Sequence, residues 1–156
     1  MLACLPALAG CGLRPLYGAG GAGPVAQTLR NVEVAPIPGR AGWLLRTELE
    51  DRLGASEGAS RYRLQIAIDD RLEGLGVRAD DAVTRERRTL RARFQLIEAA
   101  TGQVVLDDTR GSDVGIDVVG SQYATVAAEQ TALERLADDV ADQIVARLAT
   151  YARNAR

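Results

Sequence analysis

The sequence predicts an α+β fold, a two-layer sandwich in which two helices pack on one face of a four-stranded mixed sheet. Three observations lead to this prediction. Several segments alternate apolar and polar residues with a period of two, which is typical of strands with one buried face. Two other segments carry one apolar stripe at three- and four-residue steps, as amphipathic helices do. The order of these segments, β-α-β-β-β-α, closes most simply with both helices on the same face of the sheet.

The first strand and the first helix are predicted between residues 25 and 53. Val32 and Val34 alternate with polar neighbours, and Pro36 ends the strand because proline cannot donate to a ladder. Leucines then recur every four residues over residues 43–53, which predicts a helix that ends at Gly54.

Three further strands are predicted at residues 62–70, 83–99 and 103–119. The middle one places apolar residues on one face, whereas its other face is rich in arginine: Arg85, Arg87, Arg91 and Arg93. We expect the apolar face to lie under the helices and the arginine face to meet water.

The last two of these strands are predicted to form a hairpin around residues 100–102. Gly102 suits the left-handed position of a three-residue loop with a bulge. A register in which Leu96 faces Leu106 keeps apolar side chains together. Gly115 is expected to mark a second bulge or bend.

Residues 121–153 are predicted to form a long helix with Ser121 as its N-cap. Its apolar residues form one stripe. Acidic residues crowd its first two thirds and arginines its end, as the helix dipole favours.

The composition bounds the class of protein. The chain has 156 residues, of which 47% are hydrophobic and 26% charged, and this fits one globular domain. A net charge of −2 does not favour nucleic-acid binding. The sequence has no histidine, which removes Ser-His and Cys-His catalysis and most zinc sites. Adjacent carboxylates on a strand point to opposite faces, so they do not converge on one substrate. We therefore expect a protein that is not an enzyme and that holds no cofactor or metal.

The N-terminus carries a processing signal. An apolar run leads into Leu8-Ala9-Gly10-Cys11, which resembles the lipobox of bacterial lipoproteins. The resemblance implies that residues 1–10 are a signal peptide and that Cys11 is acylated. Residues 11–24, with their glycine-rich stretch, would then be the acylated residue and a flexible linker, followed by one domain over residues 25–156. The alternative is an ordinary apolar N-terminus with a buried cysteine.

Several short motifs together resemble one family. They are Cys11-Gly12-Leu13-Arg14-Pro15-Leu16-Tyr17-Gly18, the strand and helix of residues 34–53, Ala99-Ala100-Thr101-Gly102, and residues 117–124. In their order and spacing they are similar to the LptE family of lipopolysaccharide-assembly lipoproteins, in its alphaproteobacterial form. The resemblance implies a non-enzymatic protein that is lipid-anchored in the outer membrane and faces the periplasm. It also implies a plug in an LptD-like β-barrel, which helps that barrel assemble and contacts lipopolysaccharide.

The middle of the chain holds the candidate binding residues. Residues 61–93 contain nine arginines against six acids, whereas residues 107–142 contain nine acids against two arginines. Such asymmetry indicates a local anion-binding surface, and arginine grips phosphates and carboxylates with forked donors. The predicted lipopolysaccharide contacts are Arg78, Arg85, Arg87, Arg91 and Arg93, of which Arg78 is placed by the resemblance near a hairpin tip.

Two other roles are open for these arginines. They can form a solvated strand face paired with acids of the neighbouring strand, or they can face polar residues that line a partner barrel. An alternative function is a lipoprotein subunit of a different, ABC-type lipid-trafficking system of the envelope. The two functions differ in partner, which would be a β-barrel in one case and an inner-membrane ABC complex in the other.

Overall fold

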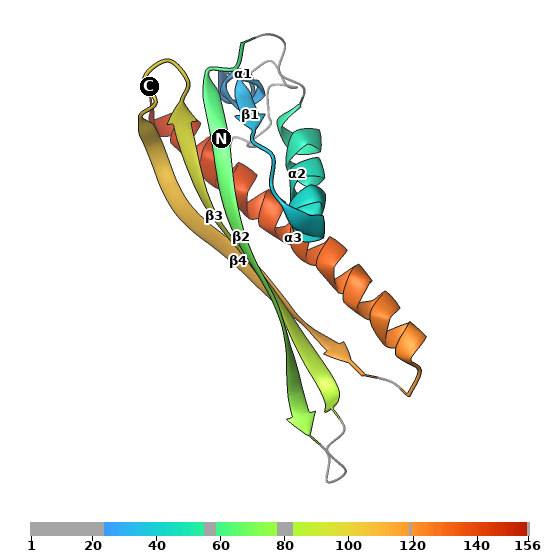
Figure 1. Ribbon diagram of the computed structural model, residues 1–156. Helices are drawn as coiled ribbons and strands as arrows, with labels where there is room; N and C mark the ends of the chain where they lie inside the picture. The colour runs from blue at the N-terminus through green and yellow to red at the C-terminus, as the bar shows by residue number, and fades with distance from the viewer. Residues whose placement is uncertain (1–23, 55–58, 78–82, 119, 156) are drawn as a thin grey trace, which may run out of the picture.

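Figure 1 shows the computed structural model of the chain, in which residues 24–54, 59–77, 83–118 and 120–155 are described. Over these residues the order is α-β-α-β-β-β-α. The elements are α1 (Pro24–Arg30), β1 (Val32–Val34), α2 (Gly39–Leu53), β2 (Tyr62–Val77), β3 (Val83–Glu98), β4 (Val104–Asp117) and α3 (Gln122–Asn154). The predicted α+β fold with a four-stranded mixed sheet is confirmed, with one short helix added.

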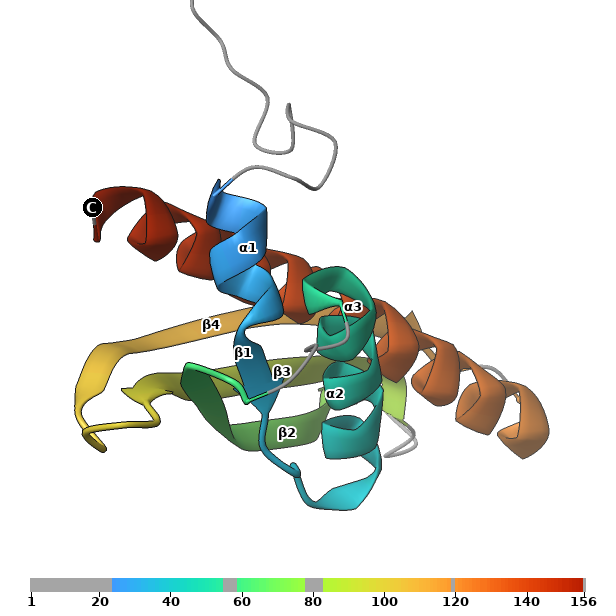
Figure 2. The same cartoon turned by 90° about the horizontal axis from the view of Figure 1, so that it is seen from above.

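The strands lie side by side in the order β1-β2-β3-β4. β1 runs parallel to β2, and the other two pairings are antiparallel. Both α2 and α3 lie over the same face of the sheet (Figure 2). β1 pairs with β2 only as far as Leu64, so the rest of β2 continues with β3 and β4 as a long, twisted ribbon (Figure 1).

The core lies between the helices and the face of the sheet that they cover. Alternate residues of the strands contribute large apolar side chains to this core, and the two long helices supply the facing layer. All of these side chains are at most 2% exposed. They are Leu64, Leu90, Phe94 and Leu96 of the sheet, Leu45 and Leu49 of α2, and Leu136, Val140, Ile144 and Leu148 of α3. Burial of each such side chain contributes about 1.5–3 kcal/mol. This layer is therefore the main source of stability. Among the described helices, none is both long and apolar enough to cross a membrane.

The hairpin between β3 and β4 has the predicted register. Leu96 pairs with Leu106, a bulge follows between Leu96 and Ile97, and Gly102 has a φ of +71°. The left-handed conformation favours glycine at that position. The prediction of a bulge at Gly115 is wrong, because Gly115 pairs with Arg87 in unbroken register.

The N-terminal part differs most from the prediction. α1 is not predicted from the sequence, and Pro24 belongs to this helix and not to the linker expected over residues 11–24. A helix of seven residues is unstable alone. α1, however, packs against α3 (Figure 2), and its Leu29 is buried in the core. Tertiary packing, which a local pattern does not encode, therefore stabilises it.

α2 begins four residues earlier than predicted, at Gly39. Ala41 and Gly42 in this first turn are buried. A Cβ built on Gly42 would lie 2.7 Å from the carbonyl oxygen of Ile37. This glycine thus permits a close approach of the chain inside a helix, where the sequence pattern predicts a turn.

Candidate functional site

β2, β3 and β4 have a second face, which none of the described helices covers (Figure 2). We call it the open face, and its residues are those of β3 that alternate with the core, together with their neighbours on β2 and β4. The predicted residues Arg85, Arg87, Arg91 and Arg93 are all exposed on this face. The other two predicted site residues, Cys11 and Arg78, lie outside the described residues.

Three of these four arginines pair with acids of β4. Arg93 Nη2 lies 2.7 Å from Asp107 Oδ2, Arg85 Nε lies 3.3 Å from Asp117 Oδ1, and Arg87 Nε lies 3.6 Å from Asp113 Oδ2. Exposed ion pairs of this kind contribute little to stability, because water screens them. They do neutralise most of the charge that the arginine-rich strand would otherwise present.

The pair of Arg93 and Asp107 has the best geometry of the three. Arg93 donates from Nε and Nη2 to the two carboxylate oxygens, and Gln95 Nε2 donates to Oδ2 at 2.8 Å. These hydrogen bonds, first that of Arg93 and then that of Gln95, lower the pKa of Asp107 to about 2. Both charges of the pair are therefore present at neutral pH.

Arg91 differs from its neighbours. It stands in register with Asp69 of β2 and with Gly111 of β4. Asp69 is occupied by Arg71, whose Nε and Nη2 lie 3.0 and 2.9 Å from its carboxylate oxygens, and Gly111 has no side chain. Within the described parts of the chain, Arg91 makes no ion pair within 4 Å.

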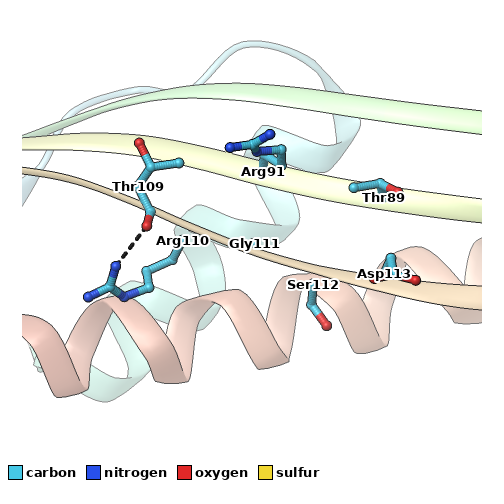
Figure 3. Close-up of a pocket in the computed structure, with 7 residues that line it drawn as sticks. All are labelled: Thr89, Arg91, Thr109, Arg110, Gly111, Ser112 and Asp113. Carbon is cyan, nitrogen blue, oxygen red and sulfur yellow. Dashed lines mark hydrogen bonds between the residues drawn. The ribbon is translucent and has the colours of Figure 1, made fainter.

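A hollow of about 350 Å³ lies beside Arg91, between β3 and the edge strand β4 (Figure 3). The side chains of Arg110 and Ser112 extend from it toward the helix-covered side, where they bond to Asp108 and to Asp139 of α3. Its lining is polar and consists of Thr89, Arg91, Thr109, Arg110, Gly111, Ser112 and Asp113. A second hollow of about 360 Å³ is lined by Ala35, Pro36, Gln65, Ile66, Ala67, Arg93 and Gln95. Hydroxyls, amides and a guanidinium offer hydrogen bonds to anions and to sugar hydroxyls.

Arg88 follows Arg87 in sequence but lies on the helix-covered face. Its Nε and Nη2 donate to Asp70 at 2.9 and 2.7 Å, and its Nη1 donates to the carbonyl oxygen of Glu129 at 3.0 Å. The hydrogen bonds to Asp70 raise the pKa of Arg88. Arg88 therefore joins β2 and β3 to α3, and it is not part of the open face.

The sequence pattern does not single out Gly111, which pairs with Arg91, or Thr109, which lines the same hollow. The signal was present, because the register that pairs Leu96 with Leu106 also brings β4 residue Gly111 opposite Arg91 once it is extended along the hairpin. In the described residues, no group of three or more His, Cys, Asp or Glu residues is placed to hold a metal ion.

Solved structures of bacterial lipoproteins share this fold. A lipoprotein from Caulobacter crescentus CB15 superposes with a TM-score of 0.71 at 28% identity, over 85% of this chain and 97% of that one. The minor lipoprotein of Acinetobacter baumannii has a TM-score of 0.58 at 16% identity, over 76% of this chain and 88% of the other. Rare lipoprotein B of Shewanella oneidensis has a TM-score of 0.57 at 13% identity, over 79% and 95%. No curated protein matches the sequence.

A family match covers the elements that build both faces of the sheet. The LptE family, described as lipopolysaccharide-assembly, matches residues 29–148, from the end of α1 to the last third of α3. The matched segment holds the core, the open face and Arg91. The chain belongs to the LptE family.

Proposed function

We propose that this chain is a non-enzymatic outer-membrane lipoprotein that plugs an LptD-like β-barrel and assists its assembly, for delivery of lipopolysaccharide to the cell surface. The observation that carries the proposal is the family match over residues 29–148. The structural likeness to a lipoprotein at 28% identity over 97% of that chain supports it.

The chemistry of the open face fits a polar partner. It presents ion pairs, hydroxyls and amides on a broad strand surface, with exposed arginines that are mostly neutralised by β4. The interior of a wide membrane barrel is itself lined with polar side chains. The open face is therefore suited to lie against such a wall, or to contact an anionic glycolipid that passes it. Arg78, Arg85, Arg87, Arg91 and Arg93 are the proposed contacts with lipopolysaccharide.

The anchor is proposed from the sequence. Removal of residues 1–10 would leave Cys11 as the acylated N-terminus, and the following residues would lead to α1, where the domain begins. One acyl chain gives only reversible membrane binding, so stable anchoring requires several chains on this residue. The protein would then face the periplasm from the outer membrane.

The test is a pull-down from outer membranes with an affinity tag placed after residue 156, followed by mass spectrometry. We expect a large β-barrel protein in roughly equal amount. Recovery of an ABC transporter in place of the barrel would support the alternative lipid-trafficking function, and recovery of no partner would contradict the proposal.

The sequence offers a matched pair of variants for the same experiment. Cys11→Ser removes the proposed acylation site, whereas Cys4→Ser changes a cysteine inside the proposed signal peptide. We expect Cys11→Ser to disappear from the outer-membrane fraction and Cys4→Ser to behave as wild type. Equal recovery of the two variants would contradict the anchor.

A further inference from the structure

β4 is the outermost strand of the sheet, and side chains cap part of its outer edge. Among the described strands it pairs with β3 alone. Arg110 Nη1 donates to the carbonyl oxygen of Thr109 at 2.8 Å (Figure 3), and Gln143 Nε2 of α3 donates to that of Gly111 at 3.4 Å. Both carbonyl groups point away from β3. Because free backbone groups of an edge strand are a template for another strand, these caps close this part of the edge.

The edge is open farther along β4, over residues 113–117. In an antiparallel pair the backbone groups turn alternately toward the partner strand and away from it. Asp113, Gly115 and Asp117 therefore point the same way as Gly111, whereas the residues between them bond to β3. No side chain of the described residues bonds to these outward N–H and C=O groups. This stretch thus offers a continuous ladder to an added strand.

A hollow of about 340 Å³ lies beside this open stretch, between β4 and α3. Its walls include apolar residues of the strand and small residues of the helix: Val114, Ile116, Ala127, Ala128, Thr131 and Ala132. The helix row that borders it begins at Tyr123, which is 88% exposed, and ends at Arg135, twelve residues later. That distance is about 18 Å along a helix, the length of five or six residues of extended strand.

The charges around the hollow favour a carboxylate. Arg135 is exposed in its lining and makes no ion pair within 4 Å among the described residues. The nearby acids of β4 are occupied, because Asp113 pairs with Arg87. Asp117 likewise pairs with Arg85. Two β4 edges from two copies of this chain would bring their aspartates together, so the charges disfavour a second copy as the occupant.

We propose that the open edge of β4 and the flank of α3 bind an extended peptide segment of another protein, which adds to the sheet antiparallel to β4. Its apolar side chains point to the small residues of α3, and an acidic side chain near its C-terminal end binds Arg135. The direction follows from α3, which runs antiparallel to β4: Ser112 bonds to Asp139, and Asp108 to Arg147. The inference does not depend on the proposed barrel, since it follows from the edge and the hollow alone.

The experiment is a titration of the full-length, ¹⁵N-labelled chain in detergent with the blocked peptide acetyl-Thr-Val-Thr-Val-Thr-Asp-amide, followed by NMR. We expect saturable binding and slower hydrogen exchange at the amides of Asp113, Gly115 and Asp117, since an added strand bonds to them. Gly115→Pro removes one of these donors and should weaken binding about fivefold or more. Gly115→Ala keeps the donor, and its Cβ meets no neighbouring atom closer than 3.7 Å. This control should change binding by less than about twofold.

Arg135 is tested with a second matched pair. A peptide with asparagine in place of its aspartate should bind the wild type about threefold more weakly, as the loss of an exposed ion pair does. Arg135→Gln should abolish this preference for aspartate. Arg153→Gln, which removes a charge from the last turn of the same helix, should keep it.

Three results would overturn the inference. The first is the absence of saturable binding, and the second is binding without slower exchange at the three outward amides. The third is equal weakening in Gly115→Pro and Gly115→Ala, which would show that the backbone of the edge is not used. Ala127→Arg fills the hollow from the helix without changing β4, so unchanged binding in this variant contradicts the groove even where the proline lowers stability. The barrel pull-down uses no peptide, so failure of the titration leaves the barrel proposal standing.

Discussion

The two faces of β3 serve different purposes although they alternate along one strand. On the helix-covered face, Leu90, Phe94 and Leu96 are at most 2% exposed. On the open face, Arg87 and Arg91 are exposed and no described helix covers them. Because a strand turns successive side chains to opposite sides, neighbouring residues of β3 contribute alternately to the core and to the surface that we propose to bind lipopolysaccharide. Substitutions of neighbouring residues should therefore have very different effects.

The largest difference in the free energy of unfolding is expected between substitutions of Phe94 and of its neighbour Gln95. Phe94 is 0% exposed and lies in the middle of the core, so Phe94→Ala should lower the free energy of unfolding by about 3–5 kcal/mol through lost burial and a cavity. Gln95→Ala, on the open face, should change it by about 0.5 kcal/mol or less. Urea unfolding followed by circular dichroism measures both. Similar losses of stability in the two variants would contradict the assignment of Gln95 to a solvent-exposed face.

The separation of the two faces is largely predictable from the sequence. Period-two alternation places Phe94 in the core and Arg91 on the open face, and matching apolar residues across the hairpin predicts the pairing of Leu96 with Leu106. α1 is not predictable in the same way, since it depends on packing against α3. The close approach of Gly42 to Ile37 is not predictable either, because the glycine indicates a turn in the sequence pattern. Local patterns encode which side of an element is apolar, but not which distant element stabilises it.

The candidate site is predictable only in part. Sequence alternation places four arginines on one face, but it does not predict which of them finds an acid. Asp69 faces Arg91 across the strands and nevertheless binds Arg71, two residues along its own strand. Such choices depend on rotamers of long side chains at distances of a few ångströms. The sequence therefore does not show that Arg85, Arg87 and Arg93 pair with acids of β4 whereas Arg91 does not, and only the structure describes these pairings.

A smaller difference in stability is expected when two ion pairs of similar geometry, one on each face of the sheet, are broken. Arg88 and Asp70, on the helix-covered side, have side chains that are 16% and 24% exposed, whereas Arg93 on the open face is 64% exposed. Removal of Arg88 leaves a carboxylate poorly solvated and frees the carbonyl oxygen of Glu129, so Arg88→Gln should cost about 1–3 kcal/mol. Arg93→Gln should cost less than Arg88→Gln.

Double-mutant cycles separate the pairs from their surroundings. The first cycle combines Arg88→Gln with Asp70→Asn, and the second combines Arg93→Gln with Asp107→Asn, each followed by urea unfolding. We expect a larger coupling energy in the first cycle. A coupling as large on the open face would mean that solvent screens those arginines much less than their exposure indicates.

The smallest expected effect is the loss of folding stability at low pH. Two consecutive aspartates, one on each face of the sheet, allow the two faces to be compared. Asp108 faces α3, where Arg147 Nε donates to its Oδ2 at 2.8 Å, and Asp107 faces solvent with Arg93. The hydrogen bond from Arg147, followed by that from the Thr109 amide, lowers the pKa of Asp108. Arg93 and then Gln95 lower the pKa of Asp107 to about 2. Both carboxylates are therefore more acidic in the folded chain than in the unfolded one.

A carboxylate with a lowered pKa in the folded state stabilises the fold above its unfolded pKa of about 3.9, and this contribution disappears as the pH falls through the folded value. The free energy of unfolding should thus be level from neutral pH to about pH 5 and then fall towards pH 2. Asp108→Asn and Asp107→Asn should each flatten this decline. At pH 6, however, Asp108→Asn should be the more destabilising of the two, because it breaks a contact between β4 and α3, whereas Asp107 joins only neighbouring strands that the backbone already holds. Urea unfolding at several pH values measures the free energy of unfolding of both variants. A larger loss in Asp107→Asn than in Asp108→Asn would mean that the ion pairs of the open face stabilise the sheet more than those beneath the helices.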